Sequence, residues 1–133
     1  MRILNNQINK TIANLNLIIA RFMHSIKKFN SYGDIMDMEK QMDGSNLLVK
    51  LNGRLDTETA PELTEALKDD LPNVKDLTFD LSDLIYISSA GLRVILSTQK
   101  IMMKQGFMKL VNVQDIVMEV FDATGFSDIL TIE

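Results

Sequence analysis

Residues 76–94 read DLTFDLSDLIYISSAGLRV, and this stretch contains the change from strand to helix that decides the fold. Across residues 76–81 apolar and polar side chains alternate with period two, which predicts a β-strand with one buried face. We expect a short connection at residues 82–87 and a helix that begins within residues 88–91. A strand that leads through a short loop into a helix is typical of α/β domains.

The helix that follows presents one face of mostly apolar residues at helical spacing. This face is predicted to comprise Leu92, Ile95, Leu96, Gln99 and Met103. We expect Gly106 to end the helix, in the position where a left-handed residue is usually needed.

Upstream, residues 47–51 form a short apolar strand, and a partner strand is expected at about residues 38–42. Residues 53–56, Gly-Arg-Leu-Asp, then lead to a helix for which either Thr57 or Thr59 is a suitable N-cap. The apolar face of this helix consists of Leu63, Ala66, Leu67 and Leu71.

Downstream, residues 107–111 are predicted to form a strand, an amphipathic helix runs from Asp115 to Gly125, and residues 129–132 form a last short strand. The order β-β-α-β-α-β-α-β predicts a single α/β domain over residues 38–133. We expect a mixed, mostly parallel sheet of about 4–5 strands with helices packed on it.

The residue inventory excludes much enzyme chemistry. The chain has no cysteine and one histidine, His24, so neither a thiol nucleophile nor a zinc site is expected. There is no glycine-rich phosphate-binding loop of the GxxxxGK[ST] or GxGxxG type. We therefore predict a protein that is not an enzyme and holds neither metal nor cofactor.

Charge divides the chain into two parts. Residues 1–33 hold five basic residues and no acid, a net charge of +5. Of the 14 basic residues nine remain in residues 34–133, against all 18 acids, a net charge of −9. An acidic domain is a poor ligand for nucleic acid, which is bound largely through clustered Lys and Arg. No apolar run approaches the ~20 residues that span a bilayer, so we expect a soluble domain.

The N-terminal residues 1–33 show a different pattern. Apolar side chains recur with spacings of four and three, which predicts a basic amphipathic helix, joined to the domain by a linker at residues 34–37. The seam comprises Ile8, Ile12, Leu15, Ile19, Phe22, Ile26 and Phe29. Three interpretations stay open: a coiled-coil or docking helix, a helix that lies on an anionic membrane, or an extension that the natural protein lacks.

The two serines at the predicted loop-to-helix junction suggest control by charge. The first N–H groups of a helix lack acceptors within the helix, and its dipole adds positive charge there, so a phosphate on Ser89 would be accommodated. A phosphate adds about −1.5 to −2 charge at neutral pH. The alternative is that Ser88 or Ser89 only caps the helix.

Residues 53–56, Gly-Arg-Leu-Asp, and residues 80–94 together resemble the STAS domain of bacterial anti-sigma factor antagonists. The similarity extends over roughly residues 38–132, and Ser-Ser-Ala-Gly-Leu is its most specific part. The resemblance implies a cytoplasmic phosphoprotein that regulates transcription by partner switching. The unphosphorylated domain would bind an anti-sigma factor that is also a serine kinase, release a sigma factor, and be restored by a PP2C-type phosphatase.

The resemblance also implies roles for particular residues. Alignment on Gly91-Leu92 places the phosphate acceptor at Ser89, and Asp56 matches the acid near the acceptor. The expected partner-binding residues are Asp56, Thr57, Ser88, Ala90, Gly91, Leu92 and Arg93. Ser88 stands where many members have Asp, which makes it a second candidate acceptor.

Two alternatives remain from the sequence. Arg93 lies one helical turn after Ser89, so it is either a partner for the phosphate or a solvated helix residue. The second functional hypothesis is a STAS subunit that docks constitutively in a larger complex, such as a lipid-transport ATPase, without phosphorylation.

Overall fold

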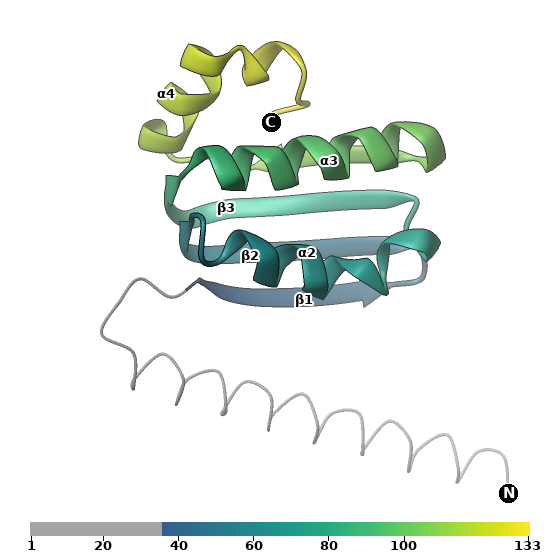
Figure 1. Ribbon diagram of the computed structural model, residues 1–133. Coiled ribbons are helices and arrows are strands. Elements are labelled where there is room, and N and C mark those ends of the chain that lie inside the picture. The colour runs from purple at the N-terminus through teal and green to yellow at the C-terminus, as the bar shows by residue number, and fades with distance from the viewer. Residues whose placement is uncertain (1–35) are drawn as a thin grey trace, which may run out of the picture. The chain divides into compact units, whose positions relative to one another are not determined.

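The computed structural model describes residues 36–133, and its centre is a four-stranded sheet (Figure 1). The strands are β1 (Asp37–Asp43), β2 (Asn46–Leu55), β3 (Asp76–Ile87) and β4 (Phe107–Val111), and they lie in the order β1-β2-β3-β4. β1 and β2 form an antiparallel hairpin, whereas β2, β3 and β4 are parallel. The predicted mixed, mostly parallel sheet is therefore confirmed.

The helices are α2 (Ala60–Lys68), α3 (Ser89–Gln105) and α4 (Asp115–Thr124), with short 3₁₀ turns η1 (Leu71–Asn73) and η2 (Phe126–Asp128). Two of them make the crossovers that parallel strands require, since α2 connects β2 to β3 and α3 connects β3 to β4. Figure 1 shows α2 and α3 side by side over one face of the sheet. The starts of both helices lie at the same edge, where β2 and β3 end.

The hydrophobic core fills the space between this face and the helices. Every second residue at the start of β2 is buried, and α2 and α3 add residues at helical spacing, as the sequence pattern requires. Its largest members, each less than 2% exposed, include Phe79, Phe121, Leu51, Leu55, Leu63, Leu81, Leu84, Ile95 and Met102.

β3 is longer than the sequence predicted. The strand continues to Ile87, so the expected connection at residues 82–87 is wrong. It pairs with β2 throughout, but the register shifts between Lys50 and Asn52 and again between Gly53 and Arg54. Each shift inserts one extra residue into β3, a β-bulge that interrupts the period-two alternation. For this reason the second half of the strand does not show a strand pattern.

Two predictions at the end of α3 also need correction. Met103, which was predicted on the apolar face, is 70% exposed, and Met102 is fully buried in its place. Successive residues of a helix point about 100° apart, so these two neighbours cannot share the buried face. Gly106 has φ 179, which is extended and not left-handed. A Cβ at Gly106 would lie 1.9 Å from the carbonyl oxygen of Lys75, so close packing and not handedness requires the glycine here.

The last predicted strand, at residues 129–132, is reduced to a single parallel bridge between Leu110 and Ile132. The η2 turn is the reason, because the N–H groups of Ile129 and Leu130 donate to the carbonyl of Phe126 and are not available to a neighbouring strand. The sheet therefore has four strands, within the predicted number.

The predictions for residues 1–33, a basic amphipathic helix with its possible docking or membrane role, lie outside the described residues, as do residues 34 and 35 of the expected linker. β1 begins at Asp37. Within the described part of the chain, none of the helices combines the length and the hydropathy needed to cross a bilayer.

Candidate functional site

The candidate site lies where the parallel strands β2 and β3 end next to each other. Leu55 pairs with Ile87 at the ends of the two strands, and the N–H of Ser88 donates to the carbonyl of Leu55 at 2.9 Å. The loop from β2 into α2 therefore begins beside the junction of β3 and α3. This arrangement brings the two sequence motifs, Gly-Arg-Leu-Asp and Ser-Ser-Ala-Gly-Leu, to one edge of the sheet (Figure 1).

The two serines of the junction have different environments. Ser88 is the N-cap of α3, and its Oγ accepts a hydrogen bond from the N–H of Gly91 at 3.4 Å. Ser89 is the first residue of α3 and its side chain is exposed. The sequence did not decide which of the two serines caps the helix. In the structure Ser88 caps it and Ser89 is exposed.

Asp56 organises the start of α2. Its Oδ1 accepts hydrogen bonds from the N–H groups of Glu58 at 3.0 Å and Thr59 at 3.1 Å, while its Oδ2 lies 3.9 Å from Nε of Arg54. Of the two expected N-cap residues, Thr59 occupies the N-cap position of α2, although its side chain makes no capping hydrogen bond, and Thr57 is exposed. The carboxylate of Asp56 accepts the N–H groups of the turn that precedes the helix.

Gly91 allows α3 to approach the end of β2 closely. A Cβ at this position would lie 2.7 Å from the carbonyl oxygen of Leu55 and 2.9 Å from Cγ1 of Ile87. Leu92 is 8% exposed and belongs to the core, while Ala90 is half-buried against it. Of the expected partner-binding residues in α3, Arg93 is the one with an exposed side chain.

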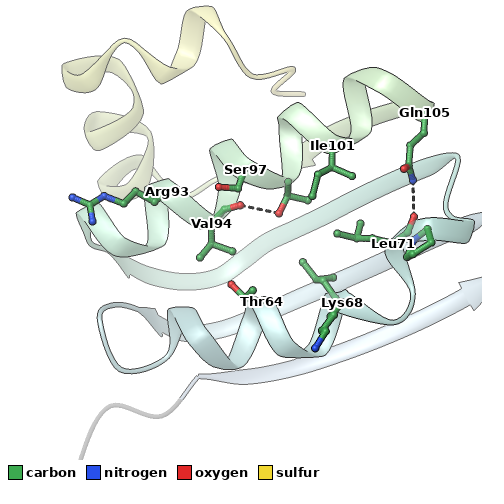
Figure 2. Close-up of a pocket in the computed structure, with 11 residues that line it drawn as sticks. Thr64, Lys68, Leu71, Arg93, Val94, Ser97, Ile101 and Gln105 are labelled. Atoms are coloured by element: carbon green, nitrogen blue, oxygen red, sulfur yellow. Dashed lines mark hydrogen bonds between the residues drawn. The ribbon is translucent and has the colours of Figure 1, made fainter.

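A groove of about 520 Å³ runs between α2 and α3 (Figure 2). Arg93 lies at its end nearest the start of α3, and Val94 and Ile101 belong to its α3 wall. At the other end Nε2 of Gln105 donates to the carbonyls of Leu71 at 2.5 Å and Val74 at 2.7 Å.

The polar groups along β3 form a small electrostatic network. Partial burial acts to raise the pKa of Asp80, but hydrogen bonds from Ser82 and Asn112 and the charge of Lys50 outweigh it, so this pKa lies below its ordinary value. The hydrogen bond and ion pair with Asp83, at 3.1 Å, raise the pKa of Lys50. Among residues 36–133, no three acidic or histidine side chains are grouped so as to hold a metal ion.

One contact at this edge was missed by sequence reasoning. The guanidinium of Arg54 lies over the ring of Tyr86, 3.9 Å from its centroid. These residues are partners in the β2–β3 ladder, so the contact depends on the shifted register. The motif containing Arg54 was recognised, but no signal in the sequence pairs it with Tyr86.

Comparisons with known proteins match nearly all of the described residues to one family. The STAS domain family model matches residues 37–133. An anti-sigma-B factor antagonist from Bacillus subtilis (strain 168) is 33% identical over 98 residues, which cover 73% of this chain and 90% of the relative. A protein of the same name from Listeria monocytogenes is 32% identical and covers 71% of this chain and 84% of the relative. The chain therefore belongs to the STAS domain family, of the anti-sigma factor antagonist type.

Solved structures show the same fold. An anti-sigma factor antagonist from Mycobacterium paratuberculosis has a TM-score of 0.67 at 20% identity and covers 74% of this chain and 85% of its own. SpoIIAA in its unphosphorylated form has a TM-score of 0.65 at 17% identity, covering 73% and 88%. The phosphorylated form of SpoIIAA from Bacillus has a TM-score of 0.60 at 16% identity, covering 73% and 91%.

Proposed function

We propose that this protein is an anti-sigma factor antagonist whose binding is switched off by phosphorylation of Ser89. The observation that carries the proposal is the exposed Ser89 hydroxyl on the first residue of α3, beside a capping Ser88 and next to the loop of Asp56. A kinase can reach Ser89 without opening the helix, because the cap is supplied by its neighbour.

The position of Ser89 explains how a phosphate would act. The N–H groups of the first turn of α3 and the helix dipole favour a negative group there, so phosphorylation requires little refolding. The phosphate adds about −1.5 to −2 charge to the surface around Asp56 and Arg93. A partner that contacts this surface would have to desolvate the phosphate, which weakens its binding.

The relatives supply the partner class. Their names describe antagonists of an anti-sigma factor, and one neighbouring structure exists in phosphorylated and unphosphorylated forms. For this chain the unmodified domain would bind an anti-sigma factor that is also a serine kinase and free a sigma factor in the cytoplasm. A PP2C-type phosphatase would restore the unmodified form. The chain itself would catalyse no reaction, and its acidic domain does not suit nucleic acid.

Phosphate mapping tests this function. The purified full chain is incubated with ATP and each candidate anti-sigma serine kinase from the same genome, and the product is mapped by mass spectrometry. Ser89→Ala is compared with Ser88→Ala and with Ser97→Ala, the last replacing another exposed serine of α3. We expect one phosphate that is lost only in Ser89→Ala, and tighter binding of the kinase by the unmodified chain.

Two results would contradict the proposal. A phosphate that persists in Ser89→Ala and disappears in Ser88→Ala would move the switch to Ser88. Absence of phosphate with every kinase would leave the constitutively docking STAS subunit of a larger complex as the better description.

A further inference from the structure

Two adjacent apolar side chains near the end of β3 both face solvent. Ile85 is 53% exposed and Tyr86 is 39% exposed, whereas Leu84 and Ile87 on either side are 0% and 4% exposed. In a regular strand successive side chains point to opposite faces, so one of two neighbours would enter the core. The second bulge of β3 falls at Ile85, between the pairs Gly53–Leu84 and Arg54–Tyr86, and it places both side chains outside.

Tyr86 is held in place by charged neighbours. Arg54 stacks on its ring at 3.9 Å, and the Nε of Arg54 lies 3.9 Å from Oδ2 of Asp56. Asp56 is in turn fixed by the N–H groups at the start of α2. Because these side chains are already ordered, a partner that binds them loses less conformational entropy than one that must immobilise free side chains.

These residues lie close to Ser89. Ile85 precedes Ser89 by four residues, which span at most about 14 Å of extended chain. A stable protein–protein contact covers about 800 Å² of each partner, a surface roughly 30 Å across. A partner centred on Ser89 would therefore reach Ile85 and Tyr86 as well. Because these residues adjoin the surface that phosphorylation controls, the anti-sigma factor is the partner we expect to cover them.

We propose that Ile85, Tyr86 and Arg54, here called the bulge patch, are a second anchor for the anti-sigma factor and insert into an apolar recess on it. This inference rests on the proposed function. Tyr and Arg are the residue types that dominate binding energy at interfaces, and Ile85 supplies the apolar area. Ser89 then sets whether the partner binds, and the bulge patch sets how tightly.

The chain offers a matched control. Phe107 is 52% exposed, nearly the same as Ile85 at 53%, and it too lies in the sheet. Phe107 pairs with Asp76 at the beginning of β3, so about 30 Å of strand separates it from the bulge patch. Loss of apolar surface at Phe107 should therefore leave binding of the anti-sigma factor unchanged.

The experiment measures the dissociation constant of the unmodified full chain for the anti-sigma factors of the same genome, by titration calorimetry. Ile85→Ser and Tyr86→Ala are compared with Phe107→Ser and with wild type. We expect the first two to bind at least about tenfold more weakly, as interface anchors do, and Phe107→Ser to stay within about twofold. Melting midpoints are recorded for each variant, and Ile85→Ser carries the test if Tyr86→Ala is unstable.

The outcomes separate this inference from the function on which it rests. If wild type binds an anti-sigma factor and Ile85→Ser binds as Phe107→Ser does, the bulge patch is not an anchor, while the proposed function stands. If wild type binds none of the anti-sigma factors, the proposed function fails and the inference fails with it.

Discussion

At the scale of single residues, Gly91 sets the distance between α3 and the end of β2. The carbonyl oxygen of Leu55, which a Cβ at Gly91 would approach to 2.7 Å, is the same atom that accepts the N–H of Ser88. The carbonyl of Leu55 and the N–H of Ser88 are backbone groups at the ends of the paired strands β2 and β3. Neither can move without disturbing the sheet. The position of the start of α3 beside the end of β2 therefore depends on the absence of a side chain at Gly91.

Replacement of Gly91 by alanine should destabilise the domain. Overpacking costs about 1–3 kcal/mol, whereas Gly→Ala in a helix gains at most about 1 kcal/mol, so we expect Gly91→Ala to lower the free energy of unfolding by about 1–2 kcal/mol. Urea denaturation followed by circular dichroism measures this. Ser89→Ala is the control, because the side chain is exposed and its loss should change stability by less than about 0.5 kcal/mol. Equal stability of Gly91→Ala and wild type would show that the carbonyl of Leu55 can move.

At the scale of elements, Gln105 connects the end of α3 to the turn that follows α2. Its amide donates to the carbonyls of Leu71 and Val74. The carbonyl of Leu71 also accepts the N–H of Val74. The same side chain closes the groove between α2 and α3 (Figure 2). One amide therefore joins the two crossover helices at the end of the domain opposite Ser89.

Loss of this amide should loosen the α2–α3 pair. Gln105→Leu keeps the apolar part of the side chain but removes both hydrogen bonds, and we expect a decrease of about 1–2 kcal/mol in the free energy of unfolding. The neighbouring exposed Lys104 provides the control, since Lys104→Ala should stay within about 0.5 kcal/mol. Hydrogen exchange at the amides of η1 gives a second measurement, and unchanged exchange in Gln105→Leu would contradict the connection.

The elements also show what sequence patterns can and cannot predict. Regular alternation and helical spacing were sufficient for β4, α4 and the first half of β2, because each of these buries one face at regular spacing. β2 continues to Leu55 beyond the predicted strand, where burial no longer alternates, and α2 ends at Lys68, so Leu71 lies in η1 and not in the predicted helix. The second half of β3 could not be predicted, since its two bulges depend on pairing with β2. Ser89 and Asp56 were found through the family resemblance, whereas the Arg54–Tyr86 contact required the register.

At the scale of the whole molecule, acidic groups outnumber basic ones, and the partly exposed network around Asp80 ties stability to pH. Because the pKa of Asp80 is lowered in the folded state, its stabilising contribution is complete above the pKa of the unfolded chain, about 3.9. That contribution is lost as the pH falls through the folded pKa.

We therefore expect the difference in stability between wild type and Asp80→Asn to shrink as the pH is lowered from about 6 to about 3. Urea denaturation at a series of pH values measures the difference. Asp69→Asn, on an exposed position after α2, gives the comparison for a general change in charge. A difference for Asp80→Asn that stays constant over this range would mean that the carboxylate does not favour the folded state.

The pairing of a capping serine with an exposed serine has a practical consequence for work in cells. Because the side chain of Ser88 caps the helix and that of Ser89 does not, the chain can be locked in either signalling state by one substitution, Ser89→Ala for the unmodified state or Ser89→Glu for an imitation of the modified one. Both locked forms should accumulate to the same level as wild type. A difference between them in sigma-dependent gene expression then reports recognition alone, free of any difference in protein abundance.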